Sequence, residues 1–321
     1  MTVRLGILST ARINRLLLHG ARQTDRVEVA AVASRDLTRA QAYAREQGIE
    51  RAYGSYEDLL ADPEVEAVYN PLPNSLHVEW SIRALEAGKH VLCEKPMGRH
   101  PSDVERAFDV ADRAGLVLTE AFMYRHNPQT ARLKELVDGG AIGDLRLVRS
   151  AFSFTIADAA NIRLAADLDG GALMDVGSYC VSGSRLLAGE PERVYGRSVV
   201  ESGVDTVFVG TLEFAGDVLA QFDCGFRLPF RHDLEAIGTE GSVFVGDPWH
   251  CRRPGIELRR DGGVDEIALD PVDSYRLELE NLADAIRGAA PPLLGRRDAL
   301  CQARTIDALY RSAAEDAAVM P

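Results

Sequence analysis

The stretch VRLGILSTARINRLLLHGARQTDRVEVAAVA, residues 3–33, decides the fold of the first part of the chain. It contains an apolar run at 3–8, a segment over 11–22 with apolar residues at helical spacing, and a second apolar run at 27–33. Short apolar runs bounded by turn residues are typical of buried strands. Because parallel strands need a crossover connection, this stretch predicts a strand, a helix and a second parallel strand.

The same alternation continues to about residue 122. The further elements that it predicts are strands at 65–70, 90–94 and 116–119 and helices over 36–47, 75–88 and 101–114. Parallel strands that alternate with helices form a sheet covered on both faces. We therefore expect residues 1–122 to form an α/β domain of the Rossmann type, which binds a dinucleotide.

Longer β runs with turn signals such as AGD and GTEG replace this pattern from residue 123 onward. The runs are 144–156, 193–203, 205–216, 217–228 and 232–245. Helical patterns at 127–138, 174–188, 273–288 and 297–315 are expected to cover one face of the resulting sheet. Residues 123–321 are thus predicted to form an α+β domain on a large, mostly antiparallel open sheet, and the helix over 297–315 could pack back on the first domain.

Charge and composition exclude several classes of protein. The 321 residues contain 36 Lys and Arg against 49 Asp and Glu, so the net charge of −13 argues against binding to nucleic acid or to an anionic membrane. No apolar segment reaches the roughly 18 residues of a membrane span and no signal sequence is evident, so we expect a cytoplasmic protein. Five widely spaced cysteines predict free thiols, and seven histidines without metal-ligand spacing predict no metal.

The turn after the first strand is built from small and basic residues: Ser9, Thr10, Ala11, Arg12 and Ile13. In a dinucleotide-binding fold, backbone N–H groups of this turn approach the pyrophosphate at the N-terminus of the next helix. The glycine pattern GxGxxG is absent, because Ser9, Ala11 and Asn14 hold its three glycine positions. The turn indicates a phosphate-binding loop, while an ordinary βα turn with Ser9 as the helix cap remains an alternative.

The end of the second strand indicates which dinucleotide is bound. Enzymes that bind NAD usually have an acidic residue there for the ribose diol, whereas this chain has Ser34 and Arg35. A hydroxyl and a guanidinium suit the 2′-phosphate of NADP, because Arg is permanently charged and can donate two parallel hydrogen bonds. We expect Asp36 to cap the following helix. NADP is therefore the expected cofactor, with NAD possible.

Two further motifs lie at strand ends, where an open α/β sheet binds its ligand. They are PLPNSLH at 71–77 and CEKPM at 93–97. Here the sequence resembles the Gfo/Idh/MocA oxidoreductases, the family of glucose-fructose oxidoreductase and inositol dehydrogenase. The segments that carry the resemblance are AGKHVLCEKPMG (87–98), NPLPNSLHVEWSIRALEAGKH (70–90), EAFMYRHNPQ (120–129), IGDLR (142–146) and GGALMDVGSY (170–179). The resemblance is colinear over essentially the whole chain.

The resemblance implies that Lys95 is the active-site lysine, which assists proton transfer at the substrate while a hydride moves to or from the nicotinamide. It also implies a cis peptide bond between Lys95 and Pro96. Glu94 matches a ribose-contacting acid, although a helix cap or a partner for Lys95 is nearly as plausible. The other positions that the resemblance assigns to cofactor binding are Pro71, Leu72, Asn74, His77, Pro96 and Arg125.

Asp175 and Tyr179 lie four residues apart and so are expected on one face of a helix. Many family members have histidine at the second position, whereas the dimeric dihydrodiol dehydrogenases and xylose dehydrogenases have tyrosine. This chain therefore resembles that branch, with its keto-sugar reductases, most. A phenol beside Lys95 could pass a proton to the substrate oxygen, and the sequence leaves open which of Lys95 and Tyr179 is the final donor.

Substrate contacts are expected from Tyr124, His126 and Arg163, in addition to Asp175 and Tyr179. Tyr124, Arg125 and His126 open the second domain, where the family has residues near the nicotinamide and the substrate. Arg163 could reach a sugar hydroxyl or a phosphate, and a plain surface role is the alternative.

The function that these residues predict is NADP(H)-dependent hydride transfer on a small polyol, sugar or keto sugar. A trans-dihydrodiol dehydrogenase or an aldose 1-dehydrogenase would use the same residues. A dinucleotide-binding sensor without turnover and a redox-assisted glycoside-cleaving enzyme are further alternatives. Intact Lys95, Asp175 and Tyr179 favour an enzyme over a sensor. The resemblance also implies a homodimer, or a dimer of dimers, through the open face of the second-domain sheet.

Overall fold

The computed structural model describes residues 1–321 and divides into two compact units. The first unit comprises residues 1–123 and 273–300, and the second comprises 124–272 and 301–321. The sequence pattern assigned residues 273–300 to the second part of the chain, so the structure differs from that expectation for this segment. No helix combines the length and the apolar character that a membrane span requires.

The first unit is built on a six-stranded sheet in the order β3-β2-β1-β4-β5-β6. Its strands are β1 (Val3–Leu8), β2 (Val27–Ala33), β3 (Arg51–Tyr53), β4 (Ala67–Asn70), β5 (His90–Glu94) and β6 (Leu118–Ala121). All neighbouring strands run parallel, which confirms the predicted Rossmann sheet. The sequence analysis missed β3, because three residues are too few to show a period.

Helices on this unit begin and end at residues that suit those positions. They are α1 (Asn14–Ala21), α2 (Leu37–Gln47), α3 (Tyr56–Leu60), α4 (His77–Glu86), α5 (Pro101–Ala114) and α8 (Ser274–Ile286), with the short 3₁₀ turn η1 (Asn74–Leu76). The carboxylate of Asp36 accepts a hydrogen bond from the Arg39 N–H, so Asp36 caps α2 as predicted. Gly48 ends that helix with φ +72°, a conformation that glycine adopts without steric cost.

One predicted helix covers a different sheet from the one expected. The pattern over 273–288 was expected to cover the second-domain sheet, and this prediction is wrong. Leu279 and Leu282 of α8 lie in the core of the first unit with Leu17 and Leu18 of α1. An amphipathic pattern shows that a helix buries one face, but it does not show which partner covers that face.

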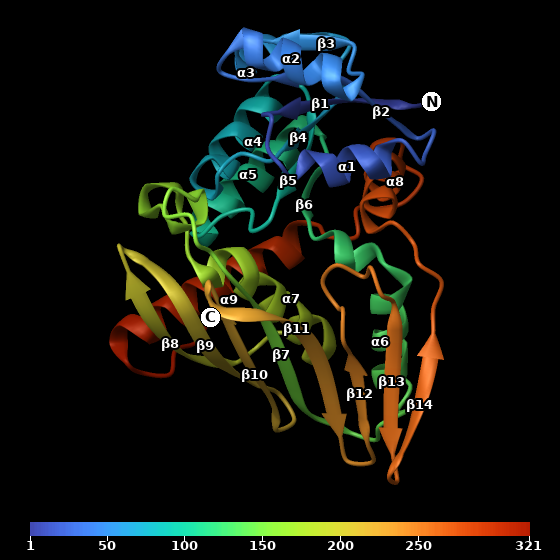
Figure 1. Cartoon of the computed structure of the whole chain (residues 1–321), viewed down its shortest axis with the longest axis vertical. Coiled ribbons are helices and arrows are strands. Elements are labelled where there is room, and N and C mark those ends of the chain that lie inside the picture. Colours follow the sequence, from blue (N-terminus) through green and yellow to red (C-terminus); the bar gives the residue numbers. More distant parts are fainter. The chain divides into compact units, whose positions relative to one another are not determined.

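The second unit is built on an eight-stranded sheet in the order β14-β13-β12-β11-β7-β10-β9-β8 (Figure 1). Its strands are β7 (Leu145–Thr155), β8 (Arg193–Glu201), β9 (Val204–Phe214), β10 (Val218–Gly225), β11 (Arg227–Gly238), β12 (Ser242–Val245), β13 (Gly255–Arg260) and β14 (Gly263–Ala268). Only β7 and β10 pair in parallel, so the predicted mostly antiparallel sheet is confirmed.

The predicted strands of this sheet need two corrections. The run at 232–245 forms two strands, because the turn of Thr239–Gly241 interrupts it between β11 and β12. Strands β13 and β14 were not predicted, since charged residues outnumber apolar ones over 257–266. Both strands lie at one edge of the sheet, where a strand can be polar.

Three helices accompany this sheet, together with several shorter turns. The helices are α6 (Pro128–Asp138), α7 (Ser178–Ala188) and α9 (Arg296–Glu315), and the turns are η2 (Met123–His126), η3 (Ile162–Leu164), η4 (Ala166–Leu168) and the π-helical η5 (Leu173–Gly177). Helix α7 contacts β7, β10 and β11, and α6 contacts β12 and β13. Ser312 of α9 accepts a hydrogen bond from the Gly196 N–H of β8 at 3.0 Å. One face of the sheet is therefore covered by helices.

Candidate active site

The turn after β1 has the backbone of a glycine-containing phosphate loop. Ser9 has φ +134°, a region that favours glycine and is strained for other residues. The Ser9 hydroxyl accepts a hydrogen bond from the Ala11 N–H at 3.2 Å, and the fully buried Asn14 donates to the Ser9 carbonyl at 2.9 Å. Thr10 and Ala11 are half-buried, whereas Arg12 is exposed. Strain held in this way by local contacts is typical of a functional turn.

Two guanidinium groups lie between the end of β2 and the first turn of α2. Ser34 is buried, and its hydroxyl accepts a hydrogen bond from the Asp36 N–H at 3.4 Å. Arg35 and Arg39 are both exposed, and both lie close enough to Tyr56 to act against the rise in its pKa that burial causes. The structure therefore adds Arg39 to the predicted Arg35. The sequence signal that could have identified Arg39 is its position four residues after Arg35, at the start of a helix.

His77 joins the two motifs at the carboxyl ends of β4 and β5. Its ring nitrogens lie 2.7 Å from the Leu72 carbonyl oxygen and 2.9 Å from the Pro96 carbonyl oxygen. Burial lowers the pKa of His77 to about 4, so the imidazole is neutral at pH 7 and donates to one of the two carbonyls. The peptide bond between Lys95 and Pro96 is cis, as the resemblance implies. His77 thus joins the segment that contains Leu72 to the segment that contains Pro96, and so helps to position the half-buried Lys95.

Buried polar groups also surround Glu94. The Tyr69 hydroxyl donates to one Glu94 carboxylate oxygen, and the Lys95 N–H donates to the other at 3.3 Å. Burial, and then the charge of Glu94, raise the pKa of Tyr69 well above its usual value, so Tyr69 stays a donor. Glu278 of α8 lies 2% exposed, and burial and Glu94 raise the pKa of its carboxyl. Sequence reasoning missed Tyr69 and Glu278, which have no motif around them.

The second unit brings Arg163 and Asp175 together. The Arg163 Nε donates to Asp175 Oδ2 at 2.5 Å. The Arg163 side chain is 42% exposed, so it can also meet a ligand, whereas that of Asp175 is 14% exposed. Asp175 lies in the π-helical turn η5, and the α-helix predicted over 174–188 begins at Ser178 instead. Such π turns often occur at functional sites.

An aromatic group surrounds Tyr179. Its ring lies 5.4 Å from that of Phe152, 5.8 Å from that of Tyr124 and 5.9 Å from that of Trp249. These spacings are in the range of favourable aromatic contacts. Phe152 and Trp249 were missed by the sequence analysis, because neither lies in a motif.

Of the remaining predicted residues, Tyr124 and Arg125 point to the same hydroxyl. The Tyr124 hydroxyl and Arg125 Nη1 lie 2.8 and 3.3 Å from Ser182 Oγ. Tyr124 is 1% exposed, which makes it a buried support of Tyr179. Burial, and then the charge of Arg125, lower the pKa of His126 to about 4, so His126 is neutral at pH 7.

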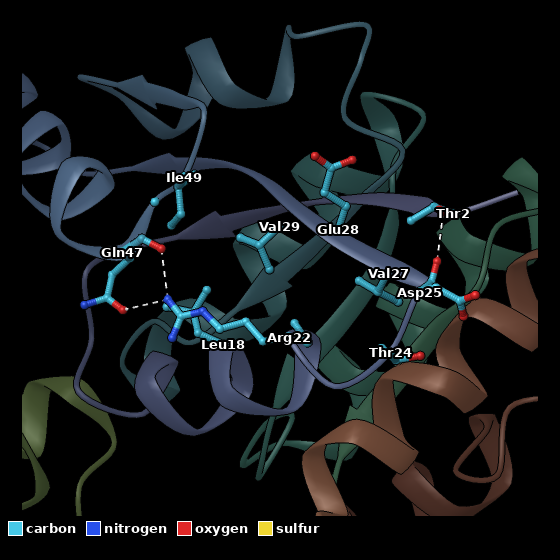
Figure 2. A pocket seen from close by; sticks show the side chains of 12 residues that line it. Thr2, Leu18, Arg22, Thr24, Asp25, Val27, Glu28, Val29, Gln47 and Ile49 are labelled. Carbon is cyan, nitrogen blue, oxygen red and sulfur yellow. Dashed lines mark hydrogen bonds between the residues drawn. The ribbon is translucent and has the colours of Figure 1, made fainter.

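A separate pocket of about 400 Å³ lies in the first unit (Figure 2). Twelve residues that lie between Thr2 and Ile49 in the sequence line it. One of them is Arg22, which donates a hydrogen bond to the Gln47 carbonyl at 2.9 Å. Thr2 precedes β1 and Val27 begins β2, so the pocket lies at the amino ends of these strands. Ligands of open α/β sheets bind at the carboxyl ends, where the predicted site residues lie.

A Rossmann sheet with a glycine-like turn after β1, and a lysine directly after β5, are features of nicotinamide-dependent oxidoreductases. Residues 3–122 match the oxidoreductase family with an NAD-binding Rossmann fold, and residues 130–244 match the GFO/IDH/MocA C-terminal domain. The chain belongs to the GFO/IDH/MocA oxidoreductase family. The resemblance stated from the sequence is confirmed.

Relatives of known activity resemble the chain over nearly its whole length. D-xylose 1-dehydrogenase (NADP(+)) 2 of Haloferax volcanii is 42% identical over 98% of both chains. Trans-1,2-dihydrobenzene-1,2-diol dehydrogenase of Bos taurus is 34% identical over 88% of this chain and 84% of its own. The crystal structure of a 3-ketoreductase from Actinomadura kijaniata, in complex with NADP and TDP-benzene, has 32% identity and a TM-score of 0.92, covering 97% of this chain and 98% of that one.

Proposed function

We propose that this protein is an NADP(H)-dependent oxidoreductase that transfers a hydride between the nicotinamide and a sugar-like alcohol or carbonyl. The observation that carries the proposal is the fixed position of Lys95 directly after β5. On one side of it, Glu94 accepts hydrogen bonds from the Tyr69 hydroxyl and the Lys95 N–H. On the other side, the His77 ring lies at hydrogen-bond distance from the Pro96 carbonyl. Two relatives support it: an NADP-dependent D-xylose 1-dehydrogenase that is 42% identical, and a 3-ketoreductase that is 32% identical and was crystallised with NADP.

The residues of the first unit fit a dinucleotide. The backbone of Ser9, with φ +134°, allows a close approach to a pyrophosphate at the start of α1, where the helix dipole favours an anion. Arg35, just after β2, and Arg39, in the first turn of α2, are exposed and would hold the 2′-phosphate. When bound, the cofactor supplies or accepts the hydride.

The proton that accompanies the hydride would be handled by Lys95 and Tyr179. The ammonium group of a lysine and the hydroxyl of a tyrosine can each donate a proton to a substrate oxygen and take it back in the reverse reaction. Asp175 orients the Arg163 guanidinium, and the 42% exposed Arg163 side chain would meet the substrate hydroxyls. Tyr124 packs against Tyr179 and acts as a positioning residue.

A screen of absorbance at 340 nm tests this function. NADP and NADPH would be tried with pentoses, hexoses, keto sugars, inositols and trans-dihydrodiols. We expect turnover with at least one sugar or keto sugar. Turnover with a trans-dihydrodiol alone would favour the second candidate, which the bovine relative supports. Tight NADPH binding without turnover on the whole panel would instead indicate a sensor and contradict the proposal.

A homodimer through the open face of the eight-stranded sheet is part of the proposal. Val209 and Leu219 lie on neighbouring strands β9 and β10 and are 50% and 45% exposed. A sheet face that carries exposed apolar side chains and that no helix of the chain covers offers a surface for a second copy. Light scattering at micromolar concentration should give twice the chain mass of 35.0 kDa, and Leu219→Lys should lower it. A monomer in the wild-type protein would contradict this part.

We also propose a cytoplasmic location. All five cysteines are free, and four of them are buried. Free thiols are typical of a reducing compartment such as the cytoplasm. Fractionation of cells that express the tagged protein is the corresponding measurement.

A further inference from the structure

Two histidines and one aspartate meet in the second unit, although the sequence spacing predicted no metal. They are His232 on β11, and Asp247 and His250 in the segment that follows β12. One ligand atom of each residue lies within 4.8 Å of the other two. Asp247 is buried and the histidines are half-buried. Residues 15 and 3 positions apart match no short metal motif, so only the fold reveals the group.

Two of the three pairs of ligand atoms already lie near the spacing that a small divalent ion requires, and the ligand atoms of the two histidines lie within 4.8 Å of each other. His232 Nδ1 lies 3.2 Å and His250 Nδ1 lies 3.7 Å from Asp247 Oδ1. Bonds of about 2.0–2.1 Å in a tetrahedral site place neighbouring ligand atoms about 3.3 Å apart. Shifts of a few tenths of an ångström would therefore bring these pairs into coordination distance.

One of these atoms lacks a partner of its own. His232 Nδ1 is shielded from solvent and makes no hydrogen bond, despite its distance of 3.2 Å from Asp247. A buried polar atom without a partner is uncommon and calls for a physical cause. A cation between the ring nitrogen and the carboxylate would satisfy both groups at once, because each can offer it a lone pair.

Neighbouring groups hold the aspartate in place. Its Oδ2 accepts hydrogen bonds from the backbone N–H groups of Arg252 at 2.8 Å and Arg253 at 3.1 Å. Its Oδ1 accepts from the His250 N–H at 3.3 Å. Outer contacts of this kind orient a metal-binding carboxylate before the ion arrives.

Aromatic rings hold the two histidines. The Phe230 ring lies 4.5 Å from that of His232, and the Phe152 ring lies 5.5 Å from that of His250. Phe230 is 60% exposed, so the group lies near the surface where an ion can enter. Phe152 also contacts Tyr179, which connects this group to the candidate active site.

We propose that His232, Asp247 and His250 form a binding site for Zn²⁺. Two imidazoles and one carboxylate are a zinc ligand set that leaves a fourth position for water. Mg²⁺ and Ca²⁺ prefer sites made of oxygen ligands, so they fit this group poorly. The bound ion would fix the segment after β12, and with it the position of Phe152. This site does not depend on the proposed oxidoreductase function.

Calorimetric titration of the chelator-treated, dialysed full-length protein with ZnCl₂ tests the proposal. We expect one Zn²⁺ per chain with a micromolar or tighter Kd. His232→Gln and His250→Gln should each weaken binding at least tenfold, whereas the matched control His100→Gln, which changes an exposed histidine of the first unit, should not. The absence of binding to the wild-type protein, or an affinity in both site variants equal to that of the wild type, would overturn the proposal.

A second measurement needs no variant. Co²⁺ replaces Zn²⁺ in such sites, and a four-coordinate Co²⁺ site absorbs visible light more strongly than the hydrated ion. We expect one equivalent of Co²⁺ to give such bands in the wild-type protein, and one equivalent of Zn²⁺ to remove them. Spectra that stay those of hydrated Co²⁺ would contradict a site of this geometry.

Discussion

Replacing Glu278 should stabilise the protein relative to the wild type, and this gain should grow as the pH rises. Glu278 is 2% exposed, and neither of its carboxylate oxygens has a hydrogen-bond partner. Burial, followed by the charge of Glu94, raises the pKa of this carboxyl well above its usual value. The folded state therefore binds the proton more tightly than the unfolded state. The stability that this proton supplies is complete below the unfolded pKa and is lost as the pH rises toward the folded pKa.

The size of the effect follows from the environment of the carboxyl. A buried polar group without a partner costs about 1–3 kcal/mol, and 1 kcal/mol shifts Tm by about 2–4 °C in domains of 150–250 residues. Glu278→Leu should therefore raise Tm by roughly 2–12 °C at pH 8 and by less at pH 5. Glu278→Gln removes only the titration and should flatten the dependence of Tm on pH.

Thermal melts followed by circular dichroism between pH 5 and 8, without cofactor, provide the assay. Glu280→Gln is the matched control, because Glu280 lies two residues further on the same helix and is partly exposed. This control should follow the wild-type curve. The reasoning is refuted if Glu278→Gln also follows it, or if Glu278→Leu is less stable than wild type at pH 8, since the carboxylate would then have a satisfying partner.

Three further predictions concern the cofactor side of the first unit. Ser9→Gly should be at least about 1 kcal/mol more stable than Ser9→Ala in urea unfolding, because glycine alone adopts φ +134° without strain, and the reverse order would contradict a strained turn. Arg35→Asp should shift the ratio of kcat/KM for NADP over NAD toward NAD, and a further shift is expected with Arg39→Asp, whereas Arg45→Asp, at the far end of α2, should leave the ratio unchanged. Because the pKa of His77 is lowered to about 4, stability should fall by about 3 kcal/mol between pH 7 and pH 4, and a His77→Gln variant with the same pH dependence as wild type would contradict this.

The sequence predicted the parts of the fold that repeat with a period. Alternation of apolar runs with helical spacing predicted five strands of the parallel sheet, and the longer β runs predicted a mostly antiparallel second sheet. The sequence analysis did not predict the polar edge strands β13 and β14, because they bury little apolar surface. Helix α8 was predicted as a helix but with the wrong partner, since Leu279 and Leu282 would suit either sheet.

The candidate site divides in the same way. Motifs predicted Lys95, Asp175 and Tyr179 as site residues, and the position of Asp36 predicted the helix cap that the structure confirms. Residues that come together only through the tertiary structure have no local sequence motif that predicts them. Glu278 is far from Glu94 in sequence, and His232 is 15 residues from Asp247, so spacing could predict neither the influence of Glu94 on Glu278 nor the proximity of His232 and Asp247.

The most direct measurement of the central claim separates catalysis from cofactor binding in Lys95→Ala and Tyr179→Phe. Lys134→Ala is the matched control, since Lys134 forms an exposed ion pair with Asp138 on α6. For the best substrate of the 340 nm screen, kcat should fall about 10²–10⁴-fold in Lys95→Ala and by a smaller factor in Tyr179→Phe, while the Kd for NADPH measured by fluorescence stays within about threefold of wild type. Wild-type turnover in Lys95→Ala would contradict the account.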